Sequence, residues 1–177
     1  QEASTQSLRN YLTFGGLPYL CNLPLEQEII FEYLRNVYST IILKDVVKRE
    51  GIRNVDFLET LAIYTADNVG NLFSSNNISR YLKSQHVNIS PIQVINYLKA
   101  LQNAYLINKV RRIDVNGLKT FEIGDKYYFE DLGLRNCHFG FTMQKDIHKL
   151  MENAIFLHLS QKHYEVFTGQ QTGGKEI

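Results

Sequence analysis

The feature that most constrains the fold is a long run of apolar residues spaced for one face of a helix. Between residues 25 and 48 these side chains recur at steps of three and four, which is the spacing of an amphipathic α-helix. Such a helix spans roughly 35 Å at ~1.5 Å per residue. The sequence therefore predicts a helical core that starts near Pro24. The apolar positions are Leu25, Ile29, Ile30, Tyr33, Leu34, Val37, Tyr38, Ile41 and Ile42.

Shorter helices follow, and two of them have the outline of a helix-turn-helix. Asn54 is an oxygen cap for a helix that reaches about Asp67. A short helix around residues 78–82 comes next. Ser90 and Pro91 then combine a cap with proline at the first helical position. The short helix, the brief connection and the helix from Ser90 predict a helix-turn-helix. The last helix carries on one face Ile92, Ile95, Leu98 and Leu101.

After this helix the apolar period changes to that of strands. Residues 107–115 and 118–123 flank the dipeptide Asn116-Gly117, which supplies the positive φ angles of a tight hairpin turn. Helix, turn, helix and β-hairpin in this order make a winged helix. We therefore expect a mainly helical α+β protein with a winged helix-turn-helix domain at residues 23–135.

The last forty residues predict the start of a separate α/β unit at residues 136–177. A helix is expected over 144–162 and a strand over 164–168, and a glycine-rich turn over 169–174 leads into a second strand. Because the chain stops within that strand and starts without methionine, we expect it to be a piece of a longer protein.

A segment near the chain end almost matches a phosphate-binding loop. Residues 169–176 read GQQTGGKE, against the pattern GxxxxGK followed by Ser or Thr. Glu176 replaces the hydroxyl that binds magnesium and places a negative charge where phosphates would lie. We therefore interpret the segment as a hairpin turn, and we expect no cofactor in this chain.

Composition excludes several classes of protein. The 19 basic and 18 acidic residues nearly balance, so any nucleic-acid surface must be local. Cys21 and Cys137 lie far apart, which argues against a disulfide framework or a zinc site and fits the cytoplasm. No apolar run approaches the ~20 residues of a membrane-spanning helix, so no membrane partner is expected.

Basic residues gather on the predicted second helix and hairpin, where they could neutralise phosphates. Two amides on the same helix, Gln93 and Asn96, are able to read base edges. The alternative is an ordinary solvated hairpin, because many winged helices bind proteins instead. The basic residues are Lys99, Lys109, Arg111, Arg112 and Lys119.

His148 and Glu152 form the one suggestive metal-ligand pair. Their spacing of four residues places both on one face of the predicted C-terminal helix. A single pair of this kind is more often an exposed helix contact, so Glu152 is a metal-ligand candidate with a structural alternative.

Several strings in order resemble the C-terminal half of a family of bacterial and archaeal AAA-type ATP-binding proteins. Their C-terminal domain carries a domain-of-unknown-function label. The strings are YLTFGGLP (11–18), IILKDVVKR with IRN (41–49 and 52–54), YLKALQNAYLI (97–107), KYYFEDLGLR (126–135), MENA (151–154) and KEI (175–177).

The resemblance implies a P-loop ATPase before the GGLP string, with ATP and magnesium belonging to that absent domain. Residues 1–22 would be the end of its lid or linker. The unit at 136–177 would be the truncated start of a restriction-endonuclease-like domain, in which a helix glutamate and a strand aspartate hold a metal. Glu152 matches the glutamate, and the aspartate would follow Ile177. This chain is therefore expected to be inactive as an enzyme.

The leading hypothesis is a regulatory module of an ATPase that binds nucleic acid or a protein partner through a winged helix. A second hypothesis is half of a metal-dependent nuclease site, and a third is a protein-interaction module that packs on the ATPase. DNA, the chain's own N-terminal ATPase domain and a second copy of the chain remain open as partners.

Overall fold

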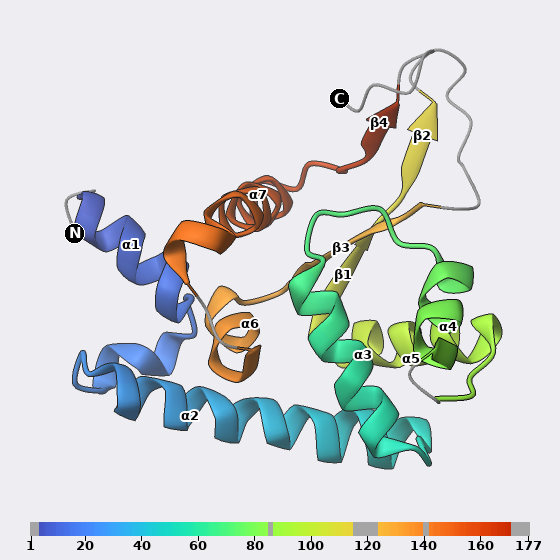
Figure 1. Cartoon of the computed structure of the whole chain (residues 1–177). Coiled ribbons are helices and arrows are strands. Elements are labelled where there is room, and N and C mark those ends of the chain that lie inside the picture. Colours follow the sequence, from blue (N-terminus) through green and yellow to red (C-terminus); the bar gives the residue numbers. More distant parts are fainter. Residues whose placement is uncertain (1–3, 85–86, 115–123, 140–141, 171–177) are drawn as a thin grey trace.

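The computed structural model describes residues 4–84, 87–114, 124–139 and 142–170, and helices make up most of it (Figure 1). This confirms the predicted mainly helical α+β class. None of the described helices is both long and apolar enough to cross a membrane. The helices are α1 (Thr5–Phe14), η1 (Pro18–Asn22), α2 (Gln27–Thr40), η2 (Ile41–Lys48), α3 (Val55–Asp67), α4 (Ser75–Ser84), α5 (Pro91–Asn103), α6 (Leu132–Phe139) and α7 (Met143–Gln161). The strands are β1 (Ile107–Val110), β2 (Arg112–Asp114), β3 (Lys126–Phe129) and β4 (Thr168–Gln170).

The long amphipathic helix is present, but its C-terminal part differs from the prediction. α2 continues without a break into η2, which is a π-helix. A strict four-residue spacing drifts around an α-helix, because one turn holds 3.6 residues. The wider π turn reverses this drift, so the apolar side chains of η2 stay on the buried side. The buried stripe is Ile30, Leu34, Tyr38, Ile42 and Val46.

Two helices begin at the oxygen caps that the sequence indicates. The Asn54 Oδ1 atom accepts a hydrogen bond from the Phe57 N–H at 3.0 Å, which opens α3. At α5 the Gln93 N–H donates to Ser90 Oγ at 3.2 Å, and the Ser90 N–H donates to Gln93 Oε1 at 3.0 Å. This reciprocal capping box, followed by Pro91, confirms the predicted start of α5.

The described strands form two small pairs. β1 and β3 pair antiparallel, with Ile107 opposite Phe129. Phe73, between α3 and α4, adds a single bridge to Asp125 next to β3. The first predicted hairpin strand is therefore confirmed over 107–114 apart from a break at Arg111, whereas the predicted turn and second strand lie within 115–123, outside the described residues.

The segment after α7 returns to the strand that follows β1. β4 pairs in parallel with β2, and the Thr168 N–H donates to the Arg111 carbonyl at 2.9 Å. The strand predicted over 164–168 was wrong except at Thr168, where β4 begins. His163 closes α7 with a positive φ of 59°, so the residues after it serve as the crossing from helix to strand.

α6 lies at the centre of the helical part, where it contacts α1, α2 and α3. Residues 132–137 are all buried. A helix that is covered on every side has no polar face and so shows no amphipathic period. This explains why periodicity did not indicate α6.

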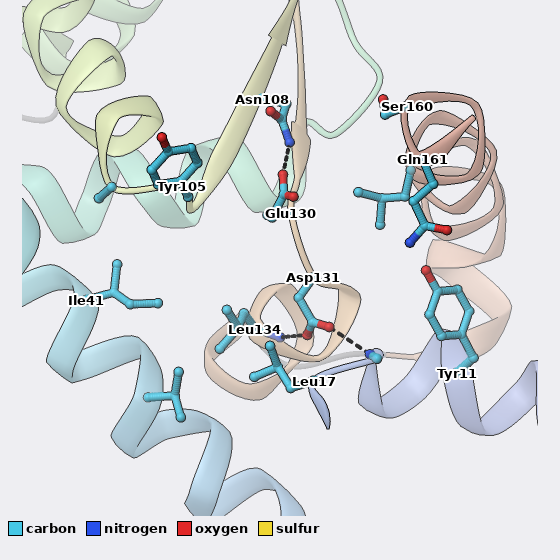
Figure 2. A pocket seen from close by; sticks show the side chains of 14 residues that line it. Tyr11, Leu17, Ile41, Tyr105, Asn108, Glu130, Asp131, Leu134, Ser160 and Gln161 are labelled. Carbon is cyan, nitrogen blue, oxygen red and sulfur yellow. Dashed lines mark hydrogen bonds between the residues drawn. The ribbon is translucent and has the colours of Figure 1, made fainter. Parts of the chain in front are cut away.

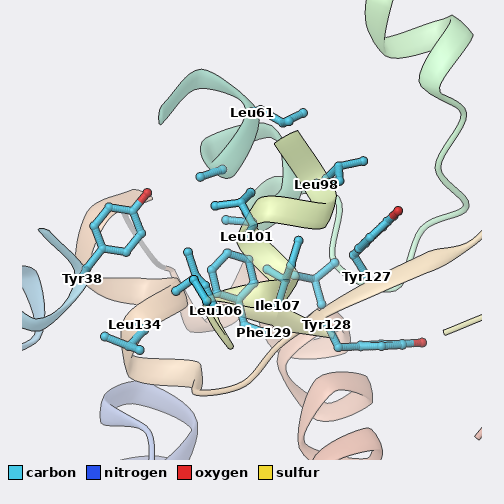
Figure 3. Packing of buried hydrophobic residues seen from close by; sticks show 14 of the residues in the cluster. Tyr38, Leu61, Leu98, Leu101, Leu106, Ile107, Tyr127, Tyr128, Phe129 and Leu134 are labelled. Carbon is cyan, nitrogen blue, oxygen red and sulfur yellow. The ribbon is translucent and has the colours of Figure 1, made fainter. Parts of the chain in front are cut away.

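One apolar cluster joins the three predicted segments 1–22, 23–135 and 136–177 (Figure 3). It runs from Leu12 in α1 to Leu157 in α7. These domain boundaries stay predictions. The central residues around β1 and β3 include Leu101, Leu106, Ile107 and Phe129, each at most 2% exposed.

The start of α6 is tied to the end of α1 by the buried carboxylate of Asp131. Its Oδ2 accepts from the Gly16 N–H at 2.7 Å, and its Oδ1 accepts from the Leu134 N–H at 2.9 Å. A Cβ atom at Gly15 would lie 2.2 Å from Asp131 Oδ1, and one at Gly133 would lie 2.0 Å from the Phe14 carbonyl oxygen. Glycine is required at both positions because the two helix ends approach so closely.

Gly15→Ala tests this contact, with Gly51→Ala as the matched control. Both glycines have positive φ, 78° and 66°, but a Cβ at Gly51 meets nothing within 4 Å. The control therefore measures the strain of a positive φ alone, roughly 1–2 kcal/mol, whereas Gly15 also has a ψ of −158°, in a region essentially restricted to glycine. We expect Gly15→Ala to lower the free energy of unfolding by a further ~1–3 kcal/mol in urea denaturation, as overpacking does. Equal losses in the two variants would show that the close approach does not matter.

Candidate functional site

The outward face of α5 combines apolar and basic side chains. Ile92 is 70% exposed and Ile95 is 52% exposed. Lys99, one turn further along, is also exposed. Spacings of three and four residues place the three side chains on one side of the helix. We refer to Ile92, Ile95 and Lys99 as the outer face of α5.

The sequence predicts that Ile92 and Ile95 share one face with Leu98 and Leu101, but only the two leucines are buried. Leu98 and Leu101 are buried as predicted, but Val94 completes their stripe instead. Positions 94, 98 and 101 are also one helical face, so the sequence contains two overlapping apolar stripes that share two leucines. Packing against α3, η2 and β1 selects the stripe that begins at Val94.

The polar residues predicted to read bases lie on α5 as expected, but they are not equivalent. Gln93 is exposed, yet its side chain is held in the capping box with Ser90. Asn96 is exposed on the helix surface. Reading of a base edge by Gln93 would therefore require its amide to leave the helix cap.

Four of the five predicted cations lie in the described residues, and their surroundings differ. Lys109 Nζ lies 2.5 Å from Asp125 Oδ2, so its charge is already paired. Arg111 and Lys99 are exposed, and Arg112 on β2 is half-buried. Lys119 lies outside the described residues. The described part of the chain therefore offers phosphates less positive charge than the sequence suggests.

A small hollow of about 120 Å³ adjoins the outer face of α5. The start of α4 forms one wall, and the end of β1 with the start of β3 forms the other. Ile95 and the Lys109–Asp125 ion pair both line it. A ligand on the outer face of α5 would thus reach the edge of the strands as well.

Glu152, the predicted metal ligand, is paired with residues of β3. Its Oε1 lies 2.9 Å from Lys126 Nζ and accepts a hydrogen bond from the Tyr128 hydroxyl at 2.7 Å. The Lys126 side chain is only 9% exposed. The neighbouring Asn153 accepts from the Phe129 N–H and donates to its carbonyl oxygen, both at 2.8 Å. Both side chains therefore attach α7 to β3.

The pairing of Glu152 supports the structural alternative considered for it. The exposed side chain of His148 lies one turn away on α7. In the described parts of the chain, no three His, Cys, Asp or Glu side chains gather closely enough to hold a metal ion. A metal role for Glu152 stays a prediction. Segment 169–176, which almost matches a phosphate-binding loop, lies mostly outside the described residues.

Glu152→Ala distinguishes the two roles of this carboxylate. The change removes a carboxylate partner from the buried Lys126, and we expect the free energy of unfolding to fall by about 1–3 kcal/mol. Adding Lys126→Met should restore part of the loss, because it also removes the buried charge that Glu152 compensates. The measurement is urea denaturation of both variants. As control, Glu165→Ala deletes an exposed carboxylate and should change stability by less than ~0.5 kcal/mol. A fully stable Glu152→Ala variant would contradict the structural role.

Sequence reasoning missed a buried polar network between α3, α6 and α7. Arg135, 1% exposed, donates from Nε and Nη2 to the Ala66 carbonyl and lies 3.2 Å from Asp146 Oδ1. Burial alone would raise the pKa of Asp146, but Arg135 and the Thr142 N–H together hold that pKa below its usual range. Asn136 donates to the Leu12 carbonyl. The string at 126–135 contains part of this network, but no spacing rule assigns it a role.

Asp131 has the opposite electrostatic environment. Burial raises the pKa of its carboxyl group, and the backbone N–H groups of Gly16, Leu134 and Gly133 oppose this shift without cancelling it. The carboxylate thus lies in a buried site whose only described hydrogen-bond donors are backbone amides. Its role is to join α1 and α6, and it also borders the cavity described below.

Comparison with known proteins places the chain in a family without assigned function. Residues 5–145 match the model of a domain of unknown function, DUF8612. The chain therefore belongs to this family. No solved structure matches the chain significantly.

Two curated relatives are similar to almost the whole chain. An uncharacterized protein of Haemophilus influenzae is 31% identical over 169 residues, which cover 94% of this chain and 41% of that protein. The uncharacterized protein MJ1544 of Methanocaldococcus jannaschii is 28% identical over 160 residues, 89% of this chain and 34% of that protein. The chain thus spans well under half the length of both relatives.

Proposed function

We propose that this chain is a winged-helix module of a larger ATP-binding protein and that it binds a protein partner through the outer face of α5. The partner we name is the ATP-binding part of the same protein. The exposure of Ile92 and Ile95 carries the proposal, since both lie on a helix that already buries a complete apolar stripe elsewhere.

The order of the elements supports the winged-helix part of the proposal. α3 is followed by the bridging residue Phe73, then by α4 and α5, and then by β1 and β3, which pair antiparallel. Phe73 bridges to Asp125 beside β3, so three extended segments lie next to one another. A helix, a short extended segment, two helices and a hairpin form the order expected of a winged helix. In this order α5 is the helix that would face a partner.

The chemistry of the outer face supports a protein rather than DNA. Two isoleucines that are more than half exposed have no role in binding phosphates, but such side chains form the apolar centre of protein interfaces. Lys99 at the end of the face suits a rim contact to an acidic residue of the partner. The predicted phosphate-binding charge is weakened because Lys109 is paired with Asp125.

The choice of the ATP-binding part as partner comes from the family resemblance and from the length of the two curated relatives. The strings quoted above resemble a family in which an ATPase precedes the GGLP motif at residues 15–18. Both curated relatives are more than twice as long as the matched region, which leaves room for such a domain in a homologous protein.

DNA is a second candidate because two of the predicted cations are exposed. Lys99 on α5 and Arg111 beside β2 both face solvent. The half-buried Arg112 and Lys119, which lies outside the described residues, belong to the same predicted set. Phosphate contacts by this set would make binding strongly salt-dependent.

The test is a titration of the separately expressed ATP-binding part with this chain by isothermal calorimetry. We expect Ile92→Ser with Ile95→Ser to weaken binding by about tenfold or more, since each loses apolar contact area at the interface. Ile63→Ser, at a 44% exposed position on α3, is the matched control and should bind like the parent chain. Thermal unfolding should show that all variants remain folded.

A parallel titration of duplex DNA by fluorescence anisotropy decides between the two candidates. Five phosphate contacts would give a slope of about −5 for log K against log salt. We expect weak binding with a shallower slope, because Lys109 is already paired. Tight DNA binding that Lys99→Ala with Arg111→Ala abolishes, together with unchanged protein binding by the isoleucine variant, would replace the protein proposal by the DNA one.

A further inference from the structure

A cavity of about 660 Å³ opens where α1, α2, α6 and α7 meet the ends of α5 and β3 (Figure 2). Its size lies within the range of small-molecule sites. The apolar part of its wall comes from the helices: Leu17, Val37, Ile41, Ala104, Leu134 and Leu157. The polar part contains two carboxylates, and Figure 2 shows Glu130 and Asp131 between Tyr105 on one side and Tyr11 with Gln161 on the other.

The charge of the wall has one sign. Glu130 and Asp131 are acidic, and none of the described residues that line the cavity is Lys, Arg or His. Asp131 is buried and accepts backbone N–H groups, whereas Glu130 is exposed and accepts a hydrogen bond from the Asn108 side chain. A ligand in this cavity would therefore meet a negative potential next to an apolar surface.

Tyr105 occupies a position where the fold alone would favour glycine. α5 ends in a Schellman motif, in which the Leu106 N–H donates to the Leu101 carbonyl and the Tyr105 N–H donates to the Gln102 carbonyl. Tyr105 therefore has a positive φ of 54°, which is unfavourable for a bulky side chain. Its ring is also 79% exposed at the cavity rim. Neither feature helps folding, so the ring at this rim points to a role in binding.

We propose that this cavity binds a guanidinium or ammonium group carried on an aliphatic stem. Glu130 accepts the hydrogen bonds of the cation, and the ring of Tyr105 covers it through a cation–π contact. The aliphatic stem packs on the apolar wall formed by α2, α6 and α7. This ligand chemistry is that of an arginine or lysine side chain of a protein and equally of a free organic cation.

A second irregular backbone segment lies beside the cavity. The π-helix η2 begins at Ile41, which lines the cavity. Short π-helical stretches in proteins occur frequently at functional sites. The site is separate from the outer face of α5, so the outcome of its test does not depend on the proposed protein partner.

The test compares two probes that share a shape and differ in charge. Butylguanidinium is the cation, and butylurea is its neutral counterpart. Both are titrated into the chain, and binding is followed by NMR chemical shifts of residues lining the cavity. We expect butylguanidinium to bind at least about tenfold more tightly, as hydrogen bonds to charged groups are the stronger ones. Equal binding of the two probes, or no binding of either, would overturn the proposal.

Glu130→Gln keeps the size of the side chain and removes its charge. It should therefore weaken the binding of butylguanidinium by about tenfold and leave the binding of butylurea unchanged. Glu28→Gln, at an exposed position at the start of α2 that does not line the cavity, is the matched control and should have no effect. Unchanged affinity of the Glu130→Gln variant would contradict the assignment of Glu130 as counter-ion.

Tyr105→Gly separates binding from stability, because the two should move in opposite directions. Glycine relieves the positive φ, so the melting midpoint should rise by about 2–4 °C, while the affinity for butylguanidinium falls. A variant with unchanged affinity would exclude the ring from the site and overturn the argument drawn from its strain.

A capped Gly-Arg-Gly peptide distinguishes the two sources of the cation. Tighter binding of the peptide than of butylguanidinium would assign the site to a protein side chain. Weaker binding of the peptide would assign it to a free organic cation. Both results agree with the proposed chemistry, whereas equal binding of a Gly-citrulline-Gly peptide, which is neutral at that side chain, would contradict it.

Discussion

The carboxylate of Asp131 joins two segments that lie 115 residues apart in the chain, and the packing of the helical part depends on this contact. It accepts N–H groups from Gly16, after α1, and from Leu134, in the first turn of α6. The close approach of the two helix ends leaves no room for a side chain at Gly15 or Gly133. α6 is thereby held among α1, α2 and α3, and the same geometry leaves a cavity beside the carboxylate.

A second set of polar contacts attaches α7 to the strands and changes the functional interpretation of Glu152. The Asn153 side chain forms hydrogen bonds with both the N–H and the carbonyl oxygen of Phe129. Glu152 pairs with Lys126 and Tyr128. A carboxylate engaged by an ammonium group and a hydroxyl is poorly placed to receive a cation, since its charge is already compensated. In the described residues, Glu152 therefore attaches α7 to β3.

Two places depart from what folding alone would favour, and they differ in character. The outer face of α5 exposes apolar side chains beside a lysine, whereas the cavity has acidic residues next to an apolar wall and an aromatic residue at positive φ. Departures of this kind in an otherwise consistent fold are expected at functional sites. The opposite charges of the two places suit different ligands, which is why we propose a protein partner for one and a guanidinium or ammonium group for the other.

The sequence by itself determined the features that depend on neighbouring residues. The caps at Asn54 and Ser90, the buried stripe from Ile30 to Ile42 and the mainly helical class follow from local spacing and hydrogen bonding, and these act before distant segments meet. The predicted stripe also included Leu25 and Ile29, which are exposed.

Tertiary structure alone decided what depends on contacts between distant segments. α6 has no amphipathic period because it is covered on every side, and α5 has two overlapping apolar stripes, so packing decides which of them is buried. The partners of Glu152 come from a strand more than twenty residues away, and the cavity combines residues from six elements and the segments between them. Local sequence cannot encode such contacts, because they form only when chain segments that are far apart pack against each other.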